Sequence, residues 1–144
     1  MVDAISPLPD EITTRNVESS FGSLHLTLLH LWNTESIWYQ RIKLVENAQM
    51  PGNADNSTSE IVKGLMQQSL QWRAWVEKSS QAALEHEFIY RNFKNQQFKQ
   101  PVYEVLLHLF NHGTYHRGQL VNMLRQVGVT TLPATDFILF TRGK

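Results

Sequence analysis

Three histidines recur at every fourth position in the C-terminal half of the chain: His108, His112 and His116. They interrupt a run that otherwise has the apolar spacing of a buried helix, and steps of four keep side chains on nearly the same helix face. Imidazole nitrogens are common ligands of zinc and other divalent transition metals. The spacing therefore points to a metal site, although HxxxH pairs also occur where histidines only pack in a core or lie at a surface.

Helix geometry limits how these histidines can be used. His108 and His116 are two turns apart, about 12 Å along the helix axis, so they cannot both bind one ion at about 2.1 Å. One pair on adjacent turns must supply two ligands, and the others must come from another helix or from solvent. His30, in the apolar run 28–32, is the best candidate for a third ligand. The alternative is a core histidine that is hydrogen-bonded to a neighbouring group.

Other polar residues accompany this pattern. Glu35 lies on the core stripe of the helix that carries His30, where it could orient a ligand, act as a general base or bind the ion. It could equally form a buried ion pair or reach water. Arg117 could pair with an anionic substrate group or form a structural salt bridge. We expect His25 to be partly exposed and His86 to lie at the surface.

The composition narrows the possible functions. The chain has 144 residues, the size of one domain, with 42% hydrophobic residues and a net charge of zero. Without a basic stripe, we expect no binding to nucleic acid or to an anionic membrane. Without cysteine, a metal must use nitrogen and oxygen ligands, and thiol chemistry would need a small-molecule cosubstrate. No signal-peptide pattern and no membrane-length apolar run is seen, so we expect a soluble, cytoplasmic protein.

The apolar periodicity predicts helices. Residues 1–18 contain two prolines and are expected to form an irregular lead-in with at most one helical turn. A core stripe with steps of three and four predicts a helix from about 20 to 48. Ser57 and Glu60 fit a capping box that opens a second helix reaching about residue 81. A short connection at 53–56 would join the two helices.

The remaining chain predicts one more long helix. The aromatic and β-branched residues of 88–99 favour a small hairpin, with an irregular loop as the alternative. A helix is expected from Pro101 to a stop at Gly128, and a short capping helix at 135–140. We therefore predict an all-α helical bundle that forms a single domain over residues 1–144.

The segment Asn111–Gln119, with the sequence NHGTYHRGQ, is similar to the signature of the DinB/YfiT-like family. The run from Ser20 to Trp38 resembles the second-helix segment of that family, and the tail from Gly128 to Phe140 also fits. The resemblance covers residues from about 19 to the end of the chain. It implies a DinB-like up-down four-helix bundle that holds a divalent metal through three histidines.

Carried over by position, the resemblance implies metal ligands at His30, His112 and His116, with His108 outside the ligand set. It also implies a homodimer and, from some relatives, a metal-dependent transferase that acts with low-molecular-weight thiols. One departure is that a full first helix is expected ahead of residue 19, so this helix is shortened or missing here. A partner chain or the short C-terminal helix would then cover the open face.

These observations give a leading hypothesis and two rivals. The leading hypothesis is a three-histidine site for Zn or Ni, in a metal-dependent thiol transferase or hydrolase with Glu35 as the candidate catalytic residue. The first rival is a non-catalytic, stress-related dimer that binds metal. The second is a helical interaction module whose histidines only pack.

Overall fold

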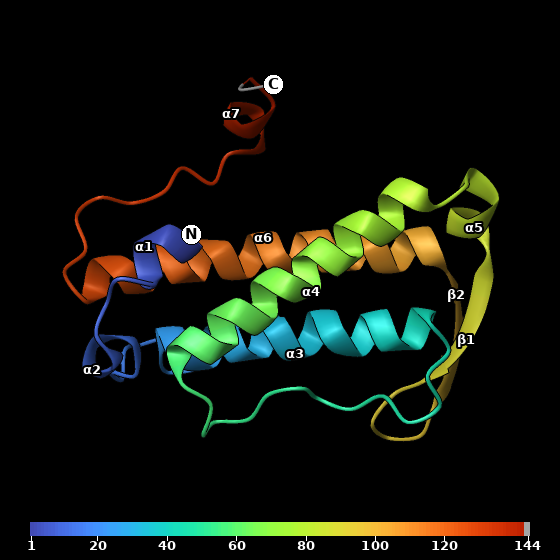
Figure 1. The fold of residues 1–144 in the computed structure, drawn as a ribbon, viewed down its shortest axis with the longest axis horizontal. Helices are drawn as coiled ribbons and strands as arrows, with labels where there is room; N and C mark the ends of the chain where they lie inside the picture. The colour runs from blue at the N-terminus through green and yellow to red at the C-terminus, as the bar shows by residue number, and fades with distance from the viewer. Residues whose placement is uncertain (143–144) are drawn as a thin grey trace.

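The structure, a computed structural model, describes residues 1–142 and is mainly helical (Figure 1). Three long helices form its body: α3 (Leu24–Ile42), α4 (Thr58–Lys78) and α6 (Val102–Gln126). The helical fold class is therefore confirmed. Within the described residues, none of the helices combines the length and apolar character needed to cross a membrane.

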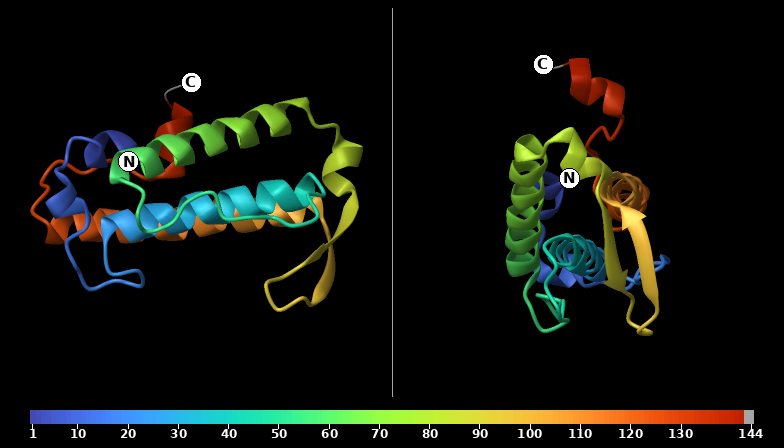
Figure 2. Two further views of the ribbon diagram at one scale, coloured as in Figure 1. Left: turned by 60° about the horizontal axis from the view of Figure 1, so that its bottom comes forward. Right: turned by 90° about the vertical axis from the view of Figure 1, so that its right-hand side faces the viewer.

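The helices α3 and α4 run in the same direction, and α6 runs opposite to both (Figures 1 and 2). The contacts agree, because His25 near the start of α3 meets Thr58 at the start of α4, and Glu35 farther along α3 meets Ser69. The connection 43–57 makes this possible by returning along the length of α3. The expected short connection at 53–56 is therefore wrong, and these two helices do not alternate up and down.

Local capping explains why α3 is shorter than expected. The Ser23 hydroxyl accepts a hydrogen bond from the Leu26 amide at 3.1 Å, which starts the helix at Leu24 rather than near 20. At the other end, Leu44 adopts a positive φ of 56°, and the Gln40 side chain bonds the backbone of Gln49. These contacts turn the chain back after Ile42, so residues 43–48 are not helical.

The start of α4 agrees with the sequence pattern. The Ser57 hydroxyl accepts from the Glu60 amide, and the Glu60 carboxylate accepts from the Ser57 amide at 2.7 Å, which completes the predicted capping box.

The indole of Trp32 in α3 lies against two glycines. A Cβ at Gly52 would lie 2.5 Å from this ring, and a Cβ at Gly64 would lie 2.4 Å from it. The two glycines therefore let α4 and the 43–57 connection approach α3 closely.

A hairpin leads into α6, as the sequence favoured. After the short helix α5 (Gln81–Glu85), strands β1 (Glu87–Arg91) and β2 (Gln97–Pro101) pair in antiparallel register. Phe88 of β1 is buried in the same apolar cluster as the start of α6. Pro101 ends β2 and immediately precedes the first residue of α6.

The N-terminal segment is more ordered than the expected lead-in. It forms two one-turn helices, α1 (Val2–Ile5) and α2 (Asp10–Thr13), and Ile5 is fully buried in the main core. The Thr13 hydroxyl lies 2.8 Å from that of Thr58, which in turn lies 3.0 Å from Nδ1 of His25. His25 is 6% exposed, so the expectation of a partly exposed histidine is wrong: the ring is buried because these hydroxyls satisfy it.

The C-terminal segment forms the expected short helix, α7 (Phe137–Arg142), after Gly128 ends α6 with a φ of 92°. It stands above the middle of α6 rather than at an end of the bundle (Figure 1). Phe137 lines a cavity together with residues of α4 and α6. Ile138 and Leu139 are 57% and 46% exposed. The helix therefore meets the side of the bundle through Phe137 and leaves its other apolar side chains largely uncovered.

The bundle has two apolar clusters rather than one continuous core. One joins α1 to the first half of α3, the start of α4 and the last turns of α6, and the other joins the hairpin to the later part of α4 and the start of α6. Polar side chains occupy the middle of the long helices between the clusters, among them His30, Glu35, Gln68 and His116. Buried polar groups are costly unless they find partners, so this middle layer is where function is sought.

The contact between Trp32 and Gly64 gives the first prediction. Replacing Gly64 with alanine removes a helix-weakening glycine, but the new methyl group would overlap the indole ring. We expect Gly64→Ala to lower the free energy of unfolding by about 1–3 kcal/mol, measured by urea denaturation. Gly118→Ala is the matched control in α6, because nothing lies within 4 Å of its added Cβ. It should raise stability by up to about 1 kcal/mol; equal stabilisation by both substitutions would contradict the packing argument.

Candidate metal centre

Three imidazoles meet between α3 and α6. Nε2 of His30 lies 2.9 Å from Nε2 of His112, and Nε2 of His116 lies 3.1 Å from the same atom. One nitrogen from each ring can be chosen so that all three lie within 4.8 Å of one another. The antiparallel packing of α3 and α6 therefore brings together the three residues that the sequence singled out as metal ligands.

This arrangement fits a divalent metal ion. Nitrogens bound at about 2.1 Å in tetrahedral geometry are separated by about 3.4 Å, close to the spacing found here. Two imidazole nitrogens at about 3 Å need either a proton or a cation between their lone pairs. The ligand atoms come from two helices held by apolar packing on both sides, so the site is largely formed by the fold itself.

Gln119 orients one of the rings. Its amide nitrogen donates to the Ser20 hydroxyl at 2.9 Å and to the Tyr115 hydroxyl at 3.0 Å. The amide oxygen therefore faces His116 and accepts from Nδ1–H at 2.7 Å. This tautomer leaves the lone pair of Nε2 of His116 directed at His112. Such outer partners commonly fix the orientation of a metal-binding histidine.

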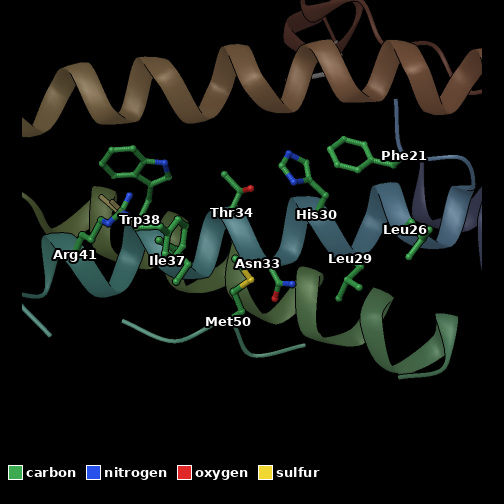
Figure 3. A pocket seen from close by; sticks show the side chains of 11 residues that line it. Phe21, Leu26, Leu29, His30, Asn33, Thr34, Ile37, Trp38, Arg41 and Met50 are labelled. Carbon is green, nitrogen blue, oxygen red and sulfur yellow. The ribbon is translucent and has the colours of Figure 1, made fainter. Parts of the chain in front are cut away.

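A groove opens beside the histidines along α3 (Figure 3). Phe21 stacks on His30 with ring centroids 4.2 Å apart, and Trp38 stands farther along the same face. Trp38 also contacts the ring of His108, with centroids 5.5 Å apart. The groove has a volume of about 370 Å³, enough for a small organic molecule next to His30.

Burial favours the neutral form of two of the rings, His30 and His112. It lowers the pKa of His30 and, together with repulsion from His116, His30 and His108, lowers the pKa of His112 to about 4. Metal binding requires the unprotonated imidazole. At neutral pH, His30 and His112 therefore present free lone pairs without first having to lose a proton.

Glu35 faces a different part of the molecule. Its carboxylate accepts from the Ser69 hydroxyl of α4 at 2.9 Å, and it lines a cavity of about 550 Å³ between α4 and α6 that Arg117 also lines. Burial raises the pKa of Glu35, against the opposing effects of the Ser69 hydrogen bond and the Arg117 charge. The described contacts of this carboxylate do not include the three histidines, and its catalytic role stays a prediction.

The other histidines lie outside this group. His108 is exposed one turn from His112, and His86 is exposed at the end of α5, as expected. Sequence reasoning missed two residues of the site. Phe21, which was placed inside the predicted helix, stacks on His30. Gln119 orients the ring of His116 and is itself held by Ser20. The spacing of three residues between His116 and Gln119, one helical turn, is the signal that could have revealed this partner.

Comparisons with known proteins identify the family and the fold of the chain. The sequence model of the DinB family matches residues 1–144, so the chain belongs to the DinB family. A relative, Protein DinB of Bacillus subtilis (strain 168), is 28% identical over 144 residues, covering 94% of this chain and 82% of the relative. The crystal structure of a DinB-like protein from Bacillus cereus ATCC 10987 has the same fold, with a TM-score of 0.71 at 19% identity over 94% of this chain and 87% of that one.

The family match also corrects an expectation. The resemblance was expected to begin near residue 19, but the match begins at residue 1. The N-terminal residues are thus part of the family fold, in agreement with the burial of Ile5 in the core.

The low pKa of His112 predicts how stability depends on pH. The unfolded chain takes up this proton below about 6.5, whereas the folded protein resists it until about pH 4. This contribution to stability is therefore complete above pH 6.5 and is lost as the pH falls toward 4. Urea unfolding of EDTA-treated protein should show that His112→Gln flattens this dependence. The exposed-histidine control His86→Gln should not, and parallel pH profiles for wild type and His112→Gln would contradict the prediction.

Proposed function

We propose that this protein binds a divalent transition metal, zinc or nickel, through His30, His112 and His116, and uses it in a thiol-dependent group transfer or a hydrolysis. One observation carries the proposal: three imidazoles from two helices converge so that their nitrogens lie within 4.8 Å of one another. Packing alone gives no reason for three imidazoles to meet by their nitrogen edges. Family membership supports the metal, whereas the reaction rests on resemblance to relatives, because a fold does not by itself define a reaction.

The bound metal and the residues around it would have different roles. When bound, a divalent cation with a free coordination position would act as a Lewis acid and lower the pKa of a thiol or a water molecule there. Gln119 would hold His116 in the binding tautomer. Phe21 would shield one face of His30 from water. Because the chain has no cysteine, the thiol would come from a low-molecular-weight cosubstrate in the groove of α3.

A direct catalytic role for Glu35 requires the substrate to reach a second cavity. Its carboxyl group lies in the cavity between α4 and α6, so the reacting atoms would have to reach that cavity. The raised pKa suits a group that exchanges a proton nearer neutral pH than an ordinary carboxyl does. Glu35 is therefore proposed as a proton-transfer residue whose contribution is measured separately from metal binding.

Self-association forms part of the proposal. The exposed faces of α4 and α6 carry several large apolar side chains, namely Met66, Leu70, Leu107 and Phe110, and Phe110 also lines the 550 Å³ cavity. Exposed apolar side chains of this size are typical of protein–protein contacts. A second copy of the chain would cover the part of this face that lies beside Phe137 of α7.

Metal content tests the centre. We expect wild type to hold about one zinc or nickel ion per chain by elemental analysis, and His112→Ala to lose it, because His112 lies between the other two rings. Gln119→Leu should weaken binding by about 10–100-fold, since it releases the ring of His116. Two controls should retain the metal. His108→Ala removes a neighbouring exposed histidine, and Gln126→Leu removes an amide that bonds the N-terminal segment at Glu18.

The outcome separates the alternatives. Equal loss of metal from His108→Ala and His112→Ala would require a different ligand set. Absence of stoichiometric metal from wild type would instead favour the helical interaction module whose histidines only pack.

Turnover tests the enzyme proposal. The metal-loaded protein should accelerate conjugation of a low-molecular-weight thiol to an electrophile or hydrolysis of a thiol conjugate, and His112→Ala should lose this activity with its metal. Glu35→Gln should keep the metal and lower kcat by about 10²-fold or more if the carboxyl transfers a proton. Bound metal without turnover in such a screen would favour the non-catalytic metal-binding protein. Full activity of Glu35→Gln would exclude Glu35 from the chemistry.

A further inference from the structure

Arg41 occupies an unusual environment at the end of α3. Its guanidinium lies over three aromatic rings, with centroid distances of 4.7 Å to Trp38, 5.2 Å to Tyr90 and 5.5 Å to Phe93. These rings come from α3, from β1 and from the turn of the hairpin. Across residues 1–142, the guanidinium forms neither a hydrogen bond nor an ion pair with another side chain. Three separate segments thus hold a cation whose donors remain unused.

A purely structural role explains this environment poorly. An arginine in the last turn of a helix interacts favourably with the helix dipole, but that effect does not require a set of aromatic rings. Burial lowers the pKa of Arg41, which shows that the folded protein disfavours its charge. Glu46 lines the neighbouring hollow beyond Arg41 but forms no ion pair with it. Among the described residues, no carboxylate therefore offsets the loss of water around this cation.

Arg41 lines the same groove as His30 (Figure 3). The backbone positions are 11 residues apart, about 16 Å along the axis. The guanidinium lies over Trp38, which is three residues nearer to His30, and this brings it to about 12 Å from the histidines along the axis. An extended tripeptide spans about 10 Å. A thiol–metal contact of about 2.3 Å at one end and an anion–guanidinium hydrogen bond of about 2.8 Å at the other supply the remaining distance.

We infer that Arg41 forms an anion-binding subsite, which holds a carboxylate or phosphate group of an elongated substrate whose thiol end lies at the histidine centre. The inference deepens the proposed function and rests on it. The planar guanidinium can bind either anion through two parallel hydrogen bonds, and the aromatic rings fix its orientation without consuming its donors. The subsite selects acidic thiols of about tripeptide length over neutral ones.

The test uses zinc-loaded protein and three probes of equal length. These are N-acetyl-Cys-Gly-Gly, its C-terminal amide, and the analogue in which aminomethylphosphonate replaces the last glycine. Isothermal titration calorimetry should show that wild type binds the carboxylate or the phosphonate about ten-fold more tightly than the amide, about 1.4 kcal/mol. The tighter of the two acids identifies the anion. Arg41→Gln should abolish this preference by lowering affinity for the acids much more than affinity for the amide.

Arg73→Gln is the matched control, because Arg73 is an exposed arginine of α4 paired with Glu77. It should retain the full preference for the acids. Three results at a zinc-loaded centre would overturn the subsite: equal affinity of wild type for all three probes, no binding of any probe, or an equal loss of preference in Arg73→Gln. An equal fold-loss of affinity for all three probes in Arg41→Gln would also overturn it, by showing that Arg41 only supports the fold. Failure of wild type to load zinc would refute the proposed function instead.

Discussion

The interface between α3 and α6 must accommodate three imidazole nitrogens that meet within it. The Nε2 atoms of His30 and His116 each lie about 3 Å from that of His112, a spacing at which lone pairs repel unless a proton or a cation lies between them. The histidines lie between two apolar clusters, where loss of water makes an unsatisfied polar group costly. The two apolar clusters supply the packing free energy that holds the helices together, and the three histidines form a polar site between the clusters.

The parallel course of α3 and α4 determines where the groove lies. Because the 43–57 connection returns along α3, the hairpin and α6 follow at the far end, and α6 then runs antiparallel back past His30. The indole of Trp32 lies against Gly52 and Gly64, which lets the connection and α4 pack closely on α3. The same topology places Tyr90 and Phe93 of the hairpin beside Arg41 at the C-terminal end of α3. The directions of α3, α4 and α6 therefore produce a groove with the histidines near one end and the guanidinium of Arg41 at the other.

Membership of the DinB family accounts for the fold, and the side chains around the centre show how the rings are held. Gln119 links His116 to Ser20 and Tyr115, so the tautomer of one ring depends on a residue ahead of α3. The cavity beside Glu35 lies between α4 and α6, apart from the groove of α3. Two cavities with different polar groups allow the histidine centre and the role of Glu35 to be examined independently.

Local sequence determined the elements whose signals are short-range. The capping box of Ser57 and Glu60, the stop at Gly128 and the hairpin all agree with the pattern, because each depends on residues a few positions apart. The histidine spacing gave His108, His112 and His116 as candidates for the same reason. The apolar surroundings of His30 made it the candidate from another helix, and the family resemblance selected His30, His112 and His116 as the ligand set. The predicted end of α3 was wrong because the apolar periodicity continues past Ile42. In the structure the Gln40 side chain bonds the backbone of Gln49, and this contact turns the chain back along the helix.

Only the tertiary structure decided how these elements meet. The parallel course of α3 and α4, the burial of His25 by Thr58 and the separation of Glu35 from the histidines each depend on contacts between residues more than 30 positions apart. The aromatic surroundings of Arg41 have the same origin, since Tyr90 and Phe93 come from the hairpin. Periodicity tells which face of a helix is apolar, but it carries no information about the direction or the neighbour against which that face packs.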